Sequence, residues 1–470
     1  MAKQTFFFYD LETSGLNPRE DRIMQFAGIR TDLDLNPIGE PYNVLVALND
    51  DTLPSPDALM VTGITPQQTV ADGYTEAEFA NILLNEIFTP DTIVVGFNNI
   101  RFDDEFIRAL FWRTFRDPYE WAWRDGRSRW DILDVIRMTR ALRPEGIEWP
   151  IVDGKAVNKL ELLSKVNGLE HTKAHDALSD VEALISVTRL IKEKQPQLYE
   201  YLLKMRDKNE VKKLVNLDSK EPFVYVSGRY SSEFGHATVA FPLTAGRNGN
   251  VLVYDLRHDP TPFLDQTAEQ LGKSLFATRE QRQEEGFVPL PVKELQYNRA
   301  PAVAPLGVLT QAGGWEKLQL SEDIINKHRS ALLSAPAFAE NVRTLFEGRP
   351  EFPKALDPEA QLYDGFIGDG DALNLMKVRT ANADQLADLQ PPFIDERLGP
   401  LLLHYKARNY PKSLAEDEAN EWEKWRAGHL MRQLPQFSAR LQALAATTTD
   451  ESKQFILQEL QLWAESILPI

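Results

Sequence analysis

The first 195 or so residues alternate stretches typical of β-strands with stretches typical of α-helices. The strand-like stretches are short and rich in aromatic and β-branched residues, as in 5–13, 26–32, 42–48 and 92–98. The helix-like stretches repeat apolar residues every three or four positions, as in 75–88, 103–115, 159–168 and 176–194. Because strands that alternate with helices form a helix-covered sheet, we predict an α/β domain with a mixed sheet.

The remaining sequence changes its pattern twice. A charged helical connector is predicted for 195–215, and between about 220 and 348 short apolar strands alternate with Gly, Asn and Pro turns. This middle part is predicted to be a small barrel-like or α+β module, and the sequence after it is mainly helical. We therefore expect three domains, at residues 1–195, 196–350 and 351–470.

Composition excludes several classes of protein. The 470 residues include no cysteine, which excludes disulfides, thiolate catalysis and Cys-ligated zinc. Any metal must bind oxygen or imidazole ligands, which suits Mg²⁺ or Mn²⁺. There is no uninterrupted apolar run of about 18 residues and no secretory signal, so we expect a cytoplasmic protein without a membrane span. The net charge of −18 disfavours broad binding to nucleic acid, although it allows a local basic groove.

The first candidate site residues are Asp10 and Glu12, at the end of the apolar strand 5–13. Alternate residues of a strand point to the same face, so both carboxylates are predicted to project together where the strand leaves the sheet. The alternative is a solvated acidic pair, since acidic residues are mostly exposed. The pair alone does not decide between the two interpretations.

Asp103 and Asp104 follow a second apolar strand, 92–97, and stand where a predicted helix begins. Asp is a good helix N-cap, and Asp104 is expected to fill that role, which would leave Asp103 for a site. Spacing alone does not separate the two residues.

His175 and Asp180 lie at the start of a late predicted helix, 176–194. Residues near the N-terminus of one helix can converge on a point above it. The alternatives are a structural or exposed histidine and a solvated helical carboxylate.

In this order, the five residues resemble the DEDD exonuclease superfamily, in its histidine subclass. The tyrosine subclass would have Tyr at position 176, where this chain has Asp176. The resemblance implies two Mg²⁺ ions per active site, with Mn²⁺ as a substitute, held by Asp10, Glu12, Asp103 and Asp180. His175, with an ordinary pKa near 6.5, is suited to accept the proton of the attacking water.

Longer segments resemble the bacterial exonuclease I family: 96–108, 128–137, 141–150 and 360–366. The resemblance implies an RNase H-like mixed-sheet exonuclease domain, an SH3-like α+β domain and an all-helical C-terminal domain. It also implies a monomer that degrades single-stranded DNA from 3′ to 5′ and releases 5′-mononucleotides in DNA repair and recombination. The implied partner is the acidic C-terminal tail of single-stranded DNA-binding protein, with Arg143 in the docking site.

Residues 101–143 contain ten arginines interleaved with aromatic residues, a mixture typical of single-strand binding. The alternative is that many of these side chains pack in the core or form salt bridges on the surface. Packing is expected especially for Phe106, Phe111 and Trp112. Alignment with the family implies DNA contacts by Arg108, Tyr119, Trp123 and Arg137. Lys159 stands where the family is expected to have Arg near the terminal nucleotide, Glu12 is a further contact to that nucleotide, and Lys208 is a candidate in the connector.

Two other functions remain open from the residues alone. One is a DEDD-type exoribonuclease or proofreading exonuclease, which would use the same chemistry on another substrate. The other is a non-catalytic single-stranded nucleic-acid-binding scaffold with a vestigial nuclease fold. A vestigial centre would be expected to lack one of the five residues, and all five are present.

Overall fold

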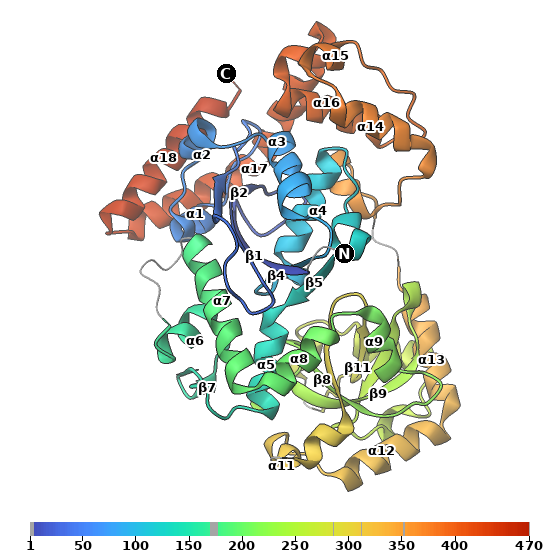
Figure 1. Cartoon of the computed structure of the whole chain (residues 1–470). Coiled ribbons are helices and arrows are strands. Elements are labelled where there is room, and N and C mark those ends of the chain that lie inside the picture. The colour runs from blue at the N-terminus through green and yellow to red at the C-terminus, as the bar shows by residue number, and fades with distance from the viewer. Residues whose placement is uncertain (1–3, 170–176, 285, 312, 351–352, 470) are drawn as a thin grey trace. The chain divides into compact units, whose positions relative to one another are not determined.

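The computed structural model describes residues 4–169, 177–284, 286–311, 313–350 and 353–469 (Figure 1). The chain divides into two compact units. The first comprises Met1–Ser128, His171–Ile185 and Pro353–Ile470, and the second comprises Arg129–Glu170 and Ser186–Phe352. The first unit therefore combines residues 1–128 and 171–185 of the predicted exonuclease region with the C-terminal helices, and the rest of that region belongs to the second unit.

The sheet of the first unit is mixed, as predicted. Four of its five strands lie in this unit: β1 (Thr5–Thr13), β2 (Ile23–Thr31), β3 (Tyr42–Leu45) and β4 (Thr92–Gly96), in the order β3-β2-β1-β4. β1 is antiparallel to β2 and parallel to β4. Phe6, Phe7 and Phe8 of β1 are fully buried, because both faces of this central strand are covered.

Helices around this sheet carry or support the candidate site. They are α1 (Pro56–Thr62), α2 (Pro66–Asp72), α3 (Glu76–Ile82), α4 (Asp103–Arg113) and the N-terminal half of α7 (Ala177–Lys194). A capping box of Thr75 and Glu78 starts α3. Phe79 of α3 and Leu110 of α4 share one core cluster with Phe7 and Phe26 of the sheet, which fixes α4 against the strand that carries Asp10.

The C-terminal part of the first unit is helical. It contains α14 (Ala372–Thr380), α15 (Ala383–Ala387), α16 (Leu398–Asn409), α17 (Glu416–Thr447) and α18 (Glu451–Ile467). Figure 1 shows α17 and α18 beside α1 and α2. A shared core contains Leu48, Leu53, Leu59, Leu430, Phe437, Leu460 and Trp463. The terminal helices thus pack into the same hydrophobic core as the exonuclease region.

The second unit contains a five-stranded antiparallel sheet in the order β11-β10-β9-β8-β12. Its strands are β8 (Phe223–Val226), β9 (Ala237–Ala245), β10 (Val251–Asp255), β11 (Val292–Leu295) and β12 (Ala302–Pro305). The longer helices of this unit are α5 (Ile132–Leu142), α6 (Leu160–Val166), α8 (Pro196–Lys204), α9 (Lys208–Leu214), α10 (Ala268–Leu275), α12 (Glu322–Ser334) and α13 (Pro336–Glu347). The sequence indicated β8, β9 and β10 only, because β11 and β12 are four residues long and contain Lys, Glu or Pro.

Across the described part of the chain, every helix is too short or too polar to cross a membrane.

Candidate active site

Asp10 and Glu12 are half-buried on β1, on either side of the buried Leu11. This alternation places the two carboxylates on one face of the strand, as predicted. Asp180 lies in the first turn of α7. One carboxylate oxygen from each of Asp10, Glu12 and Asp180 lies within 4.8 Å of the other two. A strand and a helix far apart in the sequence therefore bring three acids together.

Asp103 is the first residue of α4 and is almost completely buried. Its negative charge is one of those that raise the pKa of Asp10. The expected role of Asp104 as the N-cap is wrong: Phe102 occupies that position, without a side-chain cap. Asp104 lies one residue inside the helix and is fully buried.

Burial and the neighbouring acids together raise the pKa of Asp10 well above its ordinary value. Burial is the largest cause, followed by the negative charges of Asp103, Glu12 and Asp180. A divalent cation among these oxygens would relieve the repulsion, so the donor set suits a hard cation such as Mg²⁺ or Mn²⁺. His175, the fifth predicted member of the site, lies outside the described residues.

Besides Glu12, the first unit contains three predicted DNA contacts, which are Arg108, Tyr119 and Trp123. The Arg108 guanidinium lies 5.5 Å from the centroid of the Tyr119 ring and forms a 2.9 Å ion pair with Glu105. Trp123 exposes 63% of its surface, which is unusual for a residue of this size. These features are those of a surface that could stack nucleobases.

Two residues of the C-terminal region extend this aromatic surface. The ring centroids of Tyr119 and Phe366 are 5.7 Å apart, and Phe366 is 85% exposed. The Tyr363 hydroxyl lies 3.5 Å from Arg108 Nη1. Neither Tyr363 nor Phe366 is among the DNA contacts predicted from the sequence, although both lie in the segment 360–366 that resembles exonuclease I.

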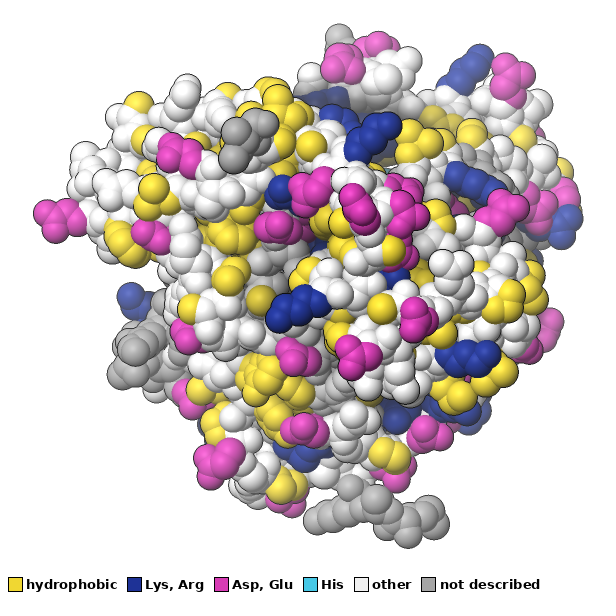
Figure 2. All heavy atoms as spheres, turned by 90° about the horizontal axis from the view of Figure 1, so that it is seen from above, with side chains coloured by type: hydrophobic (Ala, Val, Ile, Leu, Met, Phe, Trp, Pro, Cys, Tyr) yellow, Lys and Arg dark blue, Asp and Glu magenta, His cyan; other side chains and the backbone are white. Residues whose placement is uncertain are grey.

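Several other arginines and aromatics of 101–143 form the interior, as the alternative interpretation held. Arg113 pairs at 2.6 Å with the buried Glu76. Phe106, Phe111 and Trp112 are buried. On the face shown in Figure 2, Lys and Arg side chains lie scattered among Asp and Glu side chains and apolar atoms. Because distant charges are screened, the charged groups near a given surface region, rather than the net charge of the chain, determine whether it can bind DNA.

The other predicted contact residues belong to the second unit. Arg137 pairs with Asp134 at 2.7 Å and is half-buried. Lys159 is exposed at the N-cap position of α6, 3.8 Å from Glu161. Lys208 is exposed at the first position of α9. Arg143 donates to the Val308 carbonyl at 3.2 Å and to Gln311 at 3.3 Å.

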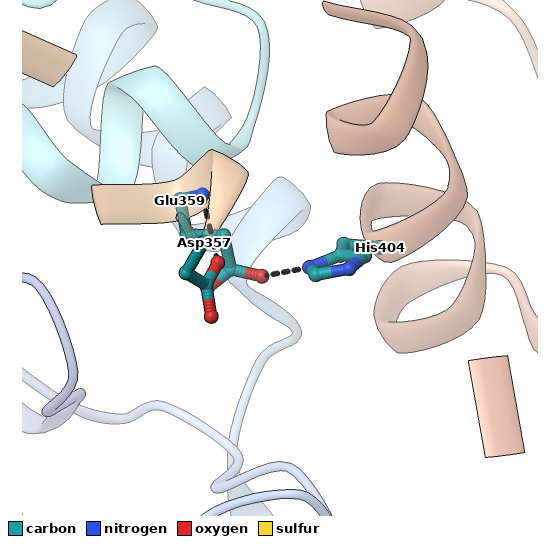
Figure 3. Close-up of side chains that lie close together, drawn as sticks. All are labelled: Asp357, Glu359 and His404. Carbon is teal, nitrogen blue, oxygen red and sulfur yellow. Dashed lines mark hydrogen bonds and ion pairs between the residues drawn. The ribbon is translucent and has the colours of Figure 1, made fainter. Parts of the chain in front are cut away.

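A second cluster of potential metal ligands is shown in Figure 3 and consists of Asp357, Glu359 and His404. The Glu359 carboxylate is already neutralised, because it forms ion pairs with Arg22 and Arg408. Since the carboxylate can only accept, His404 donates from Nδ1 to Glu359 Oε1 at 2.8 Å. Burial lowers the pKa of His404, which keeps the ring neutral. A cation would have to displace arginines here, so this cluster is a structural ion-pair network.

Comparisons with known proteins cover nearly the whole chain. Residues 7–188 match the family described as Exonuclease, 206–348 the Exonuclease I SH3-like domain, and 356–467 the Exonuclease I C-terminal domain. Exodeoxyribonuclease I of Haemophilus influenzae is 39% identical over 468 residues, which are 99% of each chain.

Solved structures are also similar over the full length, among them the following two. Exonuclease I from Methylocaldum szegediense matches with a TM-score of 0.94 and 41% identity, over 99% of this chain and 100% of that one. The zinc-bound form of the Escherichia coli exonuclease I complex with single-stranded DNA matches with a TM-score of 0.94 and 36% identity, over 99% of each chain. These matches confirm the predicted fold class: a mixed-sheet exonuclease domain, an SH3-like domain and a helical C-terminal region. The chain belongs to the exodeoxyribonuclease I family and is a metal-dependent DEDD exonuclease that degrades single-stranded DNA from 3′ to 5′.

Proposed function

We propose that the cluster of Asp10, Glu12, Asp103 and Asp180 is the centre at which this chain hydrolyses the 3′-terminal phosphodiester bond and releases 5′-mononucleotides. The observation that carries the proposal is the approach of the Asp10, Glu12 and Asp180 oxygens to within 4.8 Å of one another. The raised pKa of Asp10, caused by burial and then by Asp103, Glu12 and Asp180, adds the fourth acid to the cluster.

Two Mg²⁺ ions suit this cluster, and Mn²⁺ is the expected substitute. When bound, such ions polarise the attacking water and stabilise the leaving 3′ oxygen. The chain supplies the hard oxygen ligands from β1, α4 and α7, and the core around β1 and α4 holds these elements in place. His175 is assigned as the general base on sequence grounds, and Glu12 as a contact to the terminal nucleotide.

The aromatic surface of Arg108, Tyr119, Trp123, Tyr363 and Phe366 is proposed to hold single-stranded DNA. Exposed rings can stack on any base, and the guanidinium can contact the phosphate backbone. Arg137, Lys159 and Lys208 of the second unit are proposed as further DNA contacts. Lys159 offers a point charge rather than the fork of an arginine, so it would contact one phosphate oxygen at a time.

The wider role is proposed from the family. The chain would act as a monomer in the cytoplasm, in DNA repair and recombination. Its proposed partner is the acidic C-terminal tail of single-stranded DNA-binding protein. Arg143 is the proposed docking residue, because its guanidinium is half-buried near Gln311 and could pair with a carboxylate.

The test is a nucleotide-release assay on 3′-labelled single-stranded DNA, single-stranded RNA and duplex DNA. We expect Mg²⁺-dependent release from single-stranded DNA, little release from the other two substrates, and none after chelation. Preferred release from RNA would support the exoribonuclease alternative. Binding of DNA without release at any Mg²⁺ or Mn²⁺ concentration would support the scaffold alternative.

A further inference from the structure

The turn between β1 and β2 follows Thr13, the residue after Glu12, and Arg22 closes it. Ser14 and Arg22 exchange hydrogen bonds: the Ser14 amide donates to the Arg22 carbonyl at 2.8 Å, and the Arg22 amide donates to Ser14 Oγ at 2.9 Å. Glu12 is paired with Gln25, and Thr13 with Ile23, across a register shift. The position of Arg22 therefore determines how β2 enters the sheet beside the end of β1.

The side chain of Asp21 fills the inside of the same turn. It accepts hydrogen bonds from the Asn17 amide at 2.8 Å and from Ser14 Oγ at 3.2 Å. A Cβ atom at Gly15 would lie 2.4 Å from the Asp21 carboxylate oxygens, so glycine is what allows the carboxylate to sit there. The turn is thus a closely packed extension of the strand that carries Asp10 and Glu12.

The Arg22 guanidinium joins this turn to the C-terminal region. It is 3% exposed, and its Nη1 donates to the turn's own Glu20 carbonyl at 2.8 Å. Its Nη2 donates to Glu359 Oε2 at 2.7 Å. One planar group therefore holds the backbone of the turn and a carboxylate 337 residues later in the chain.

Glu359 is itself fixed from the opposite side. It is 2% exposed, accepts a hydrogen bond from His404 of α16, as Figure 3 shows, and forms an ion pair with Arg408 of the same helix. Arg408 also pairs with Asp51, which lies 4.0 Å from Arg22. The charges of two arginines and two acids thus balance. Because Glu359 is held by α16 on one side, it can hold the Arg22 side chain in place on the other.

We propose that Glu359 and Arg22 are positioning residues for catalysis: the C-terminal region holds the turn after Glu12 and so sets the placement of the carboxylates of β1. This inference rests on the proposed assignment of Asp10 and Glu12 to the active centre. A misplacement of about 1 Å at a reacting group can cost on the order of 100-fold in rate. The network would therefore affect turnover and metal binding more than DNA binding.

The test uses the full-length protein with Glu359→Gln, which keeps the shape of the side chain and removes its charge. The matched control is Glu418→Gln. Glu418 pairs at 2.6 Å with the buried Lys406 of α16, the helix that also carries Arg408, and among the described residues no hydrogen bond or ion pair joins Glu418 to the turn. The measurements are the melting temperature, Mg²⁺ binding by calorimetry, DNA affinity without metal, and kcat at a temperature where each variant is folded.

For Glu359→Gln we expect kcat to fall at least about tenfold, Mg²⁺ binding to weaken several-fold and DNA affinity to stay within about twofold. The control should keep wild-type kcat and Mg²⁺ binding even if it melts earlier. Arg22→Lys keeps the charge but cannot span both partners, and it carries the test if Glu359→Gln does not fold. A folded variant of either residue with wild-type kcat and Mg²⁺ binding overturns the proposal, as does an equal loss in the control. If the wild type itself releases no nucleotide, the proposed function fails instead.

Discussion

The hydroxyl of Tyr9 donates a 2.6 Å hydrogen bond to Oδ1 of Asp104, and this contact separates the roles of two adjacent acids. Asp104 also accepts a hydrogen bond from the Asn99 amide at 3.2 Å. Asp103, one position earlier, acts on Asp10 and contributes to its raised pKa. Asp104 is therefore a structural residue that joins α4 to β1, and Asp103 belongs to the candidate active site.

Mg²⁺ should stabilise the fold through the carboxylate cluster. Asp10→Asn removes one of four crowded negative charges, so it should raise the melting temperature in metal-free buffer. A ligand at 100 times its Kd stabilises a protein by about 2.7 kcal/mol, so Mg²⁺ should raise the wild-type melting temperature and raise that of Asp10→Asn much less. Thermal melts in chelator and in Mg²⁺ check both effects. Equal Mg²⁺ shifts for the two proteins would contradict the metal assignment.

Trp123→Ala should weaken the binding of single-stranded DNA by about 1–3 kcal/mol, or about 5- to 150-fold in Kd, because one stacked base loses its platform. The melting temperature should change little, since the ring is exposed. Val61→Ala is the control, as Val61 is a comparably exposed apolar residue on α1. Fluorescence anisotropy with a labelled oligonucleotide measures the affinity. Equal affinity of Trp123→Ala and wild type would remove Trp123 from the DNA surface.

Stability should fall in mild acid because of His429. Burial lowers the pKa of His429 to about 4, and its ring lies 4.7 Å from that of Trp425. In the unfolded chain the histidine pKa is near 6.5, so the unfolded state binds the proton more readily than the folded state. The stability that comes from keeping His429 neutral is therefore complete above pH 6.5 and is lost between about pH 6.5 and 4. The loss should be of the order of 1–2 kcal/mol, because solvent partly screens the ring. Chemical unfolding of wild type and His429→Gln at pH 7 and pH 5 measures it, and an unchanged difference between the two proteins would contradict the assignment.

A fragment that ends at residue 195 should not form a stable exonuclease domain. It lacks Glu359, the carboxylate that pairs with Arg22 and holds the turn between β1 and β2. It also lacks the C-terminal half of the core that covers Leu48 and Leu59. The loss of this ion pair and of the shared core should remove much of the stability of the domain, which is typically only about 5–15 kcal/mol in total. A cooperative thermal transition of this fragment near the wild-type melting temperature would contradict the conclusion that the C-terminal helices and the exonuclease region depend on one shared core.

The sequence predicted the elements that carry the site because each is locally encoded. β1 spans the residues predicted, 5–13, and Asp10, Glu12 and Asp180 meet as their positions on a strand end and a helix start implied. The joining of the C-terminal helices to the exonuclease region was not foreseen. It depends on pairs such as Arg22 and Glu359, and no local periodicity links residues so far apart. The role of Asp104 was missed for the same reason, since its partner Tyr9 lies 95 positions earlier.

The rate of mononucleotide release from 3′-labelled single-stranded DNA, measured side by side for Asp103→Asn and Asp104→Asn, tests the assignment of the active centre most directly. Both variants exchange the same group on adjacent residues, so each controls for the other. Asp103→Asn should stay folded and lose at least about 10³-fold in rate, since a metal ligand is worth several kcal/mol in the transition state. Asp104→Asn should lose about 1–3 kcal/mol of stability, while its folded molecules keep the rate within about tenfold of wild type. A wild-type rate for Asp103→Asn, or an equal loss of rate in folded Asp104→Asn, would contradict the account.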